Sequence, residues 1–301
     1  MRVGHFTSHT GRTEFQRRYA EAMALLPEPD ALTDVNTPFG TVRTFRFGPP
    51  SEAPFVVVPG MGAPASLWAA NIAGLAAHRT VYALDTLGGP GASMQRVPIR
   101  TTADQVLWLR SFLDAGDLGS VHLVGTSLGA WHALVLAARA PDRLASLALV
   151  EPTHTLARIP PPVAVASLGA SVTGSDRLRR RFRTLTGGRP GADDPVSRLV
   201  ETGMRTFSSA LPSPTYPGDD ELRSVRIPVL ALLGGRSAMH DAAKARARAE
   251  RLLPDVRVEV WPEASHALPA EYPEATAERL VAHANEVDAL ITAGTGASTH
   301  R

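Results

Sequence analysis

The chain contains a serine flanked by glycines, Gly125-Thr126-Ser127-Leu128-Gly129. An apolar run at 120–125 precedes this motif, and a helical pattern at 128–140 follows it. A sharp turn from strand to helix lifts a serine hydroxyl clear of the backbone, and the glycines allow the close backbone approach that such a turn needs. In a glycine-rich chain the same letters also arise by chance. The strand–turn–helix setting favours the chemical interpretation, a nucleophile at the carboxyl end of a strand.

A serine nucleophile needs a general base, and His266 is the candidate. It follows directly after an apolar run at 256–262 and precedes the last helical pattern of the chain. In a strand-and-helix fold with a serine on such a turn, the catalytic histidine comes after the last strand. The alternative is a histidine buried in the core. None of the other histidines has this placement.

Acyl transfer from a serine also needs donors for a developing oxyanion. The backbone N–H of Leu128 is one candidate, because it starts the helix that follows the serine. The backbone N–H of Met61 is the other, since it lies in Pro59-Gly60-Met61-Gly62, directly after the strand at 54–59. A plain glycine-rich connection is the alternative interpretation of that loop.

The elements that must position these residues follow from the hydrophobic pattern. Short apolar runs alternate with helical patterns, which is typical of parallel strands buried between helices. We therefore expect an α/β fold, with a mainly parallel sheet and helices on both faces. The expected strands lie at 54–59, 80–85, 120–125, 145–151, 227–234 and 256–262, with a hairpin around Pro38-Phe39-Gly40. The expected helices lie at 13–26, 102–116, 128–140, 241–253 and 274–292.

The segment 152–224 differs in composition from its surroundings. It is rich in proline and glycine and contains an arginine-rich stretch at 177–183. Unstructured loops of this length are uncommon in compact domains, which favours a small, partly helical lid over a poorly ordered loop. The predicted organisation is a core formed by 1–151 and 225–292, including the N-terminal helix and hairpin, a lid formed by 152–224, and a disordered tail at 293–301.

Composition narrows the classes of function. The net charge of +2, from 31 basic and 29 acidic residues, gives no basic footprint for nucleic acid. The chain has no cysteine, which excludes disulfides, thiolate metal ligands and a cysteine nucleophile. The first residues lack the apolar segment of a signal peptide, and no apolar run approaches the roughly 18 residues of a membrane span. We therefore expect a cytoplasmic protein without a nucleic-acid or membrane partner.

The glycines at 88–91, which follow Asp85, resemble a dinucleotide-binding loop only superficially. The helix that such a loop requires does not follow at the right spacing. We expect no cofactor-binding site and no metal site, and we expect Asp85 to brace a loop near Ser127.

Together these motifs resemble the α/β-hydrolase superfamily and, within it, the small bacterial carboxylesterases. The resemblance extends from about residue 13 to residue 290. It includes 67–93, where such enzymes have a helix, a strand and a glycine-rich loop, and 219–237, the run from lid into strand. It implies a Ser-acid-His triad. Two positions depart from the pattern: Pro59 replaces the histidine usual before Gly60, and Ser237 stands where an acid is usual after the strand at 227–234.

Two residues are candidates for the missing acid. His266 needs a carboxylate that fixes its tautomer and stabilises the imidazolium. Glu151 ends the strand at 145–151, where some members of the superfamily, among them haloalkane dehalogenases and lipases, carry their acid. A glutamate at the end of a buried strand is costly to leave unpaired, although a lid arginine or a backbone cap would also satisfy it. We predict Glu151 as the acid, with Asp241 as the alternative and the loss of any acid left open.

The predicted function is that of a serine hydrolase that cleaves carboxylic esters through an acyl-enzyme. Ser127, His266 and Glu151 would form the catalytic triad, and no cofactor is required. Apolar residues of the predicted lid, such as Ile159 and Val163, suggest an apolar entrance and a small or medium apolar substrate, with packing in a core as the more common use of such residues.

Two other functions stay open from the sequence. A thioesterase or cyclase acting on carrier-bound acyl chains would use the same residues, with the arginines of 177–183 meeting the acyl carrier. A noncatalytic ligand-binding relative would account for the serine at position 237.

Overall fold

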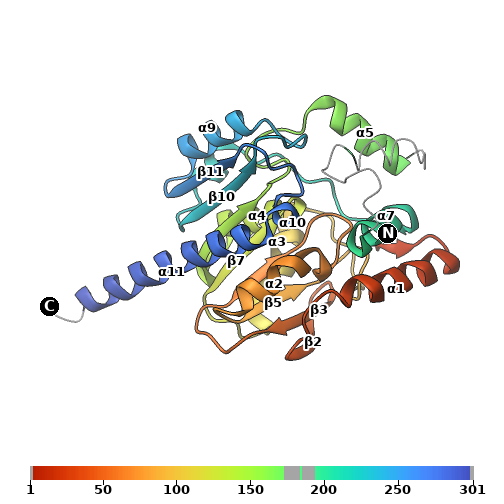
Figure 1. Ribbon diagram of the computed structural model, residues 1–301, viewed down its shortest axis with the longest axis horizontal. Helices are drawn as coiled ribbons and strands as arrows, with labels where there is room; N and C mark the ends of the chain where they lie inside the picture. Colours follow the sequence, from red (N-terminus) through yellow and green to blue (C-terminus); the bar gives the residue numbers. More distant parts are fainter. Residues whose placement is uncertain (1–2, 173–183, 185–193, 299–301) are drawn as a thin grey trace.

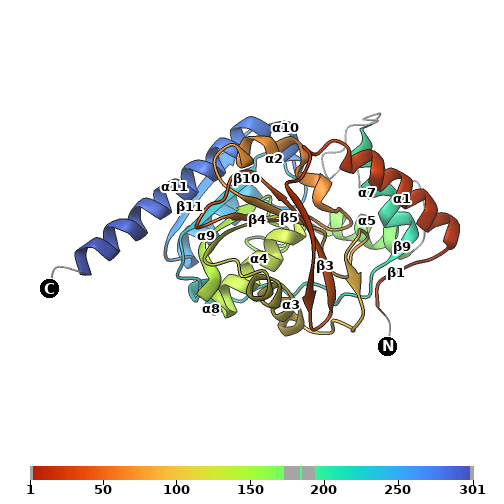
Figure 2. The ribbon, with the colours of Figure 1, turned by 90° about the horizontal axis from the view of Figure 1, so that it is seen from below.

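The computed structural model describes residues 3–172, 184 and 194–298, and it has a central sheet covered by helices on both sides (Figure 1; Figure 2). The strands are β1 (His5–Phe6), β2 (Ala31–Thr37), β3 (Gly40–Phe47), β4 (Phe55–Val58), β5 (Val81–Leu84), β6 (Met94–Gln95), β7 (Val121–Thr126), β8 (Leu144–Val150), β9 (Phe207–Ser208), β10 (Val229–Gly234) and β11 (Val256–Trp261). The helices are α1 (His9–Met23), α2 (Ala69–Ala76), α3 (Thr102–Ala115), α4 (Leu128–Arg139), α5 (Pro161–Val172), α7 (Pro195–Thr206), α8 (Asp219–Arg223), α9 (Ala242–Leu252), α10 (Leu268–Glu271) and α11 (Pro273–Ser298), with the 3-10 turns η1 (Ala65–Trp68) and η2 (Pro141–Arg143).

The large sheet has the strand order β11-β10-β8-β7-β4-β5-β3-β2, and β6 adds to β3. The pairs from β5 through β4, β7, β8 and β10 to β11 are parallel, whereas β2, β3 and β6 pair antiparallel at one edge. This confirms the predicted mainly parallel α/β sheet. Parallel strands point the same way, so the loops after β4, β7, β8, β10 and β11 meet at one edge, and these loops carry the candidate residues.

The sheet is buried on both faces. In β4, Val56 and Val58 belong to a buried cluster that includes side chains of α3 and α4, while Phe55 and Val57 belong to a second cluster that includes side chains of α2 and α11. Burial on both faces explains why the sequence shows continuous apolar runs rather than alternation. The two clusters hold the carboxyl edge of the sheet as a rigid platform.

The segment between β8 and β10 contains α5, α7, β9 and α8 within the described residues. The arginine-rich stretch 177–183 lies outside them, and the lid over 152–224 stays a prediction. The sequence assigns the N-terminal helix to the core. In the structure, the N-terminal segment also joins the insertion: β1 pairs antiparallel with β9, and Phe15 of α1 packs with Leu199 of α7.

Two helix ends differ from the prediction by four residues or more. Helix α1 begins at His9 rather than 13, because the Ser8 side chain caps it by accepting a hydrogen bond from the Gly11 N–H. Helix α11 continues to Ser298, so the predicted disordered tail at 293–301 is wrong over 293–298; residues 299–301 are not described. The glycines of this segment do not end the helix, because glycine weakens a helix by only about 1 kcal/mol and, unlike proline, keeps its N–H donor. No helix in the described part of the chain has the length and apolar character to cross a membrane.

Candidate active site

Ser127 lies in a sharp turn between β7 and α4, with φ 54° and ψ −119°. These angles are strained for a residue with a side chain, and they turn the strand directly into the helix. Both motif glycines are sterically required. A Cβ atom on Gly125 would lie 2.3 Å from the Gly129 carbonyl oxygen, and one on Gly129 would lie 2.3 Å from the Val58 carbonyl oxygen. The predicted strand–turn–helix setting of Ser127 is confirmed.

Replacing Gly129 with alanine is expected to destabilise the fold by about 3 kcal/mol or more, because the methyl group would overlap the carbonyl oxygens of Val58 and Pro59. Gly218 is a matched control, since nothing lies within 4 Å of a Cβ atom added there. Gly218→Ala is expected to destabilise the fold by no more than about 1 kcal/mol, the cost of alanine at the N-cap of α8. Urea unfolding of both variants measures the difference, and equal stabilities would contradict this account of the turn.

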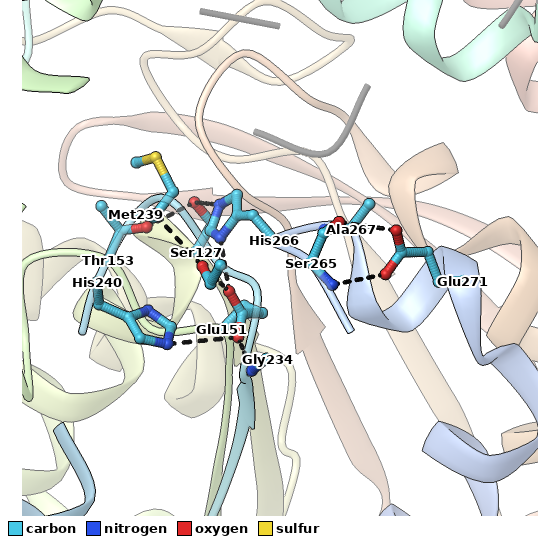
Figure 3. A network of polar contacts seen from close by, with 11 residues as sticks. Ser127, Glu151, Thr153, Gly234, Met239, His240, Ser265, His266, Ala267 and Glu271 are labelled. Atoms are coloured by element: carbon cyan, nitrogen blue, oxygen red, sulfur yellow. Dashed lines mark hydrogen bonds and ion pairs between the residues drawn. The ribbon is translucent and has the colours of Figure 1, made fainter. Parts of the chain in front are cut away.

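His266 follows β11, and its side chain is 10% exposed. Its Nε2 atom lies 3.0 Å from the Ser127 Oγ atom (Figure 3). The loop that carries it is anchored to α10, because the N–H and the hydroxyl of Ser265 each donate a hydrogen bond to the Glu271 carboxylate, both at 2.8 Å. The structure thus brings together the predicted nucleophile and the predicted base, which are far apart in the chain.

Glu151 directly follows β8, and its φ of 50° turns the chain sharply at the strand end. Its side chain is 0% exposed, and its Oε2 atom lies 3.0 Å from His266 Nδ1. The Gly234 N–H donates to Oε1, and the Ser237 hydroxyl donates to Oε2 at 2.5 Å. Ser237, which occupies the position where an acid is usual, therefore stabilises the carboxylate that reaches the histidine.

The charge on Glu151 fixes the direction of the hydrogen bonds around it. Burial alone raises the pKa of this carboxyl, but the hydrogen bond from His266, the nearby His240 and the Ser237 hydroxyl together hold its pKa below the ordinary value. A carboxylate only accepts hydrogen bonds, so the Nδ1–H of His266 donates to it. In the neutral imidazole, Nε2 is then the acceptor that faces the Ser127 hydroxyl.

Asp241, the alternative acid, has a different role in the structure. It caps α9 by accepting a hydrogen bond from the Lys244 N–H at 3.1 Å, and it forms an ion pair with the Lys244 ammonium group. Its side chain is 47% exposed. Within the described residues, no hydrogen bond or ion pair joins Asp241 to His266. The structure brings Glu151 to the histidine and leaves Asp241 at the helix cap.

The two candidate oxyanion donors lie beside the nucleophile. Leu128 is the first residue of α4, so its N–H has no partner within the helix. Met61 follows Gly60, where an added Cβ atom would lie 3.1 Å from the Ser127 Cβ atom. The loop after β4 thus passes close to the serine, and a φ of 72° at Gly62 turns it away again.

Asp85 braces this loop, as expected. Its buried carboxylate accepts hydrogen bonds from the Ala65 N–H at 2.8 Å, the Ala92 N–H at 2.7 Å and the Tyr19 hydroxyl at 2.8 Å. Burial raises the pKa of Asp85, although these three donors oppose the shift. The carboxylate therefore ties the loop after β4 to the loop after β5 and to α1.

Sequence reasoning missed two residues of the site. The Thr153 Oγ1 atom lies 3.1 Å from Ser127 Oγ. The His240 Nε2 atom lies 3.5 Å from Glu151 Oε1, and both side chains are fully buried. A closer look at the residues just after Glu151 would have suggested Thr153, because they share the carboxyl end of β8. Nothing in the local pattern distinguishes His240 from a histidine in an ordinary loop.

Comparison with known proteins supplies an independent finding. Residues 55–279 match the alpha/beta hydrolase family. Carboxylesterase YbfK of Bacillus subtilis (strain 168) is 27% identical over 274 residues, which cover 89% of this chain and 92% of that protein. The crystal structure of naproxen esterase (carboxylesterase NP) from Bacillus subtilis is similar with a TM-score of 0.83 and 25% identity, and the match covers 91% of this chain and 98% of that chain.

Proposed function

The chain belongs to the alpha/beta hydrolase family, and we propose that it is a serine hydrolase that cleaves carboxylic esters through an acyl-enzyme on Ser127. Similarity to two carboxylesterases of Bacillus subtilis along most of the chain supports ester hydrolysis. The observation that carries the serine mechanism is the continuous polar path from Glu151 through His266 to Ser127, with both hydrogen-bond distances at 3.0 Å.

In this proposal, His266 Nε2 takes the Ser127 proton while Oγ attacks the ester carbonyl carbon. The imidazolium that forms is stabilised by the buried Glu151 carboxylate and then gives its proton to the leaving alcohol. Water repeats the sequence on the acyl-enzyme: it loses a proton to Nε2 and attacks the carbonyl carbon. The C–Oγ bond then breaks, Nε2 returns the proton to Ser127 Oγ, and the acid leaves. Residues of the chain carry every proton, so this chemistry calls for no metal ion or organic cofactor.

The oxyanion of each tetrahedral intermediate would accept hydrogen bonds from the N–H groups of Leu128 and Met61. The start of α4 adds a favourable helix dipole for negative charge. The hydrogen bonds at Asp85 support this role, because they hold the loop that carries Met61.

An apolar cluster near the triad supports a small or medium apolar substrate. Val163 of α5 and Met239 are buried together, and Ile159, Met204 and Ala238 pack against them. The cluster is close to the catalytic loops, because the Met239 N–H donates to the Ser237 hydroxyl at 3.4 Å and Met204 lies near Gly62. Methionine side chains adapt to the shape of an apolar group.

The two other functions receive less support. The contact between Glu151 and His266 removes the reason for the noncatalytic interpretation, which was the serine at position 237. The carrier-dependent thioesterase rests on the arginines of 177–183, which lie outside the described residues. A cytoplasmic location remains part of our proposal.

We expect p-nitrophenyl butyrate to be hydrolysed with a kcat/KM at least tenfold above that for butyryl-pantetheine, because an esterase site makes no use of the pantetheine arm. Initial rates with both substrates test this, and Ser127→Ala provides the blank. The reverse order of kcat/KM would assign the protein to the thioesterases. Rates no greater than the blank with both substrates would favour the noncatalytic interpretation.

A further inference from the structure

Thr153 touches the atom that performs the chemistry. Its Oγ1 atom lies 3.1 Å from Ser127 Oγ, and its backbone N–H donates to the Ser127 carbonyl oxygen at 3.3 Å. The residue is 8% exposed. Figure 3 shows Thr153 and His266 close to the serine, with Glu151 beyond the imidazole. The nucleophilic oxygen therefore has two polar neighbours, an imidazole nitrogen and a hydroxyl group.

One short segment supplies both Glu151 and Thr153. The chain turns sharply at Glu151, with φ 50°, and again at His154, with φ 54°. Pro152 between them fixes its own φ near −65°. The backbone of the segment is also held by hydrogen bonds at both residues. The Glu151 N–H donates to the Leu232 carbonyl oxygen at 2.9 Å, and the Thr153 N–H donates to the Ser127 carbonyl oxygen. The carboxylate and the hydroxyl are thus held in place together at the carboxyl end of β8.

The positions of the protons on Glu151, His266 and Ser127 set the direction of the hydrogen bond between Thr153 and Ser127. The charged Glu151 accepts from His266 Nδ1–H, so the neutral imidazole accepts the single Ser127 proton at Nε2. Ser127 then has only lone pairs to offer Thr153. The Thr153 hydroxyl must therefore donate its own proton to Ser127 Oγ.

We infer that Thr153 is a further catalytic residue, whose hydroxyl donates a hydrogen bond to Ser127 Oγ and stabilises the negative charge that this atom carries while its bond to the acyl carbon forms or breaks. The inference rests on the proposed function, because it requires Ser127 to be the nucleophile.

The effect is greatest in the transition states. When Ser127 attacks, its proton moves to His266 Nε2 while an Oγ lone pair forms the new bond to carbon, and Oγ is transiently negative. When the second tetrahedral intermediate collapses, the C–Oγ bond breaks, its electron pair goes to Oγ, and Nε2 returns the proton. A hydrogen bond to an atom with partial negative charge is about twice as strong as one between neutral groups. Thr153 therefore favours both transition states over the resting hydroxyl and over the ester oxygen of the acyl-enzyme.

Thr153→Val removes the hydroxyl and keeps the branched shape, whereas Thr153→Ser keeps the hydroxyl. The matched control is Thr155→Val, because Thr155 is fully buried on the same segment and its hydroxyl has no hydrogen-bond partner among the described residues. The assay is the rate at which an alkyl fluorophosphonate labels Ser127. The noncovalent inhibition constant of butyrate, a product, serves as the measure of binding.

We expect Thr153→Val to slow labelling by roughly tenfold, with Thr153→Ser within about threefold of the unsubstituted protein and Thr155→Val unchanged. The butyrate constant should stay the same in all three variants. Labelling of Thr153→Val at the unsubstituted rate would overturn the role of Thr153 and leave the proposed function intact. Equal slowing in Thr153→Ser and Thr153→Val would assign the effect to shape and overturn the inference. No labelling of Ser127 in the unsubstituted protein would overturn the proposed function, and this inference with it.

Discussion

Ser127→Ala and His266→Ala are each expected to lower kcat for p-nitrophenyl butyrate by about 10⁶-fold. Alanine at 127 removes the atom that bonds to the acyl carbon. Alanine at 266 removes the acceptor that lies 3.0 Å from that atom, so the serine keeps its proton and is a weak nucleophile. The double variant is expected to be no worse than either single variant, because the two residues act as one unit.

The measurement is kcat with saturating ester, with thermal unfolding of each variant as the control for folding. Both side chains lie in loops at the edge of the sheet, outside the two buried core clusters, so the variants should unfold near the temperature of the unsubstituted protein. Additive losses in the double variant would mean that the residues act independently. A loss below tenfold in either single variant would exclude its proposed role.

Glu151→Gln is expected to lower kcat by about 10⁴-fold. The amide keeps nearly the same shape but has no negative charge, so it stabilises the imidazolium poorly. Its NH2 group is a donor in place of one carboxylate oxygen, so it faces either the Gly234 N–H, which now points at Oε1, or the Ser237 and His266 donors, which now point at Oε2. When the NH2 group faces His266 Nδ1, it donates to this nitrogen and holds the imidazole in the wrong tautomer for accepting the serine proton.

Asp241→Asn is the matched control for the loss of one carboxylate, and it is expected to keep kcat within about twofold. The asparagine side chain still caps α9. A second variant separates the loss of the charge from a local folding effect of the amide. The kcat of Glu151→Ala combined with Ser237→Asp should be at least tenfold higher than that of Glu151→Ala alone, because Ser237 Oγ already lies 2.5 Å from the carboxylate oxygen that contacts His266. Wild-type turnover in Glu151→Gln would end the assignment of this acid.

The local parts of the site were predictable from the sequence. The elbow around Ser127 depends on residues within a few positions of one another, and Gly125 and Gly129 have no room for a side chain in the structure. His266 was predictable because its place after the last strand follows from topology. Burial on both faces of the sheet produces continuous apolar runs, which is why most strands could be found within a few residues of their ends.

Contacts made by the tertiary fold were harder to predict. Glu151 and Asp241 are both carboxylates that follow neighbouring strands, β8 and β10, at the edge of the sheet where His266 lies. Strand order does not choose between them, and only the tertiary contact of Glu151 with His266 does. Both carboxylates could therefore be proposed as the acid from the sequence, with Glu151 preferred and Asp241 as the alternative. Thr153 and His240 were missed because their roles depend on the turns after Glu151 and after β10. The pairing of β1 with β9 was missed for the same reason, because two-residue strands carry no periodicity.

The most direct test of the Glu151–His266–Ser127 assembly is the site and rate of fluorophosphonate attachment, followed by peptide mass spectrometry in the unsubstituted protein, Glu151→Gln and Asp241→Asn. We predict an adduct on the Ser127 peptide at equal rates in the unsubstituted protein and in Asp241→Asn, and labelling at least about 10³-fold slower in Glu151→Gln. An adduct on a different residue, or equal labelling rates in all three proteins, would contradict the account.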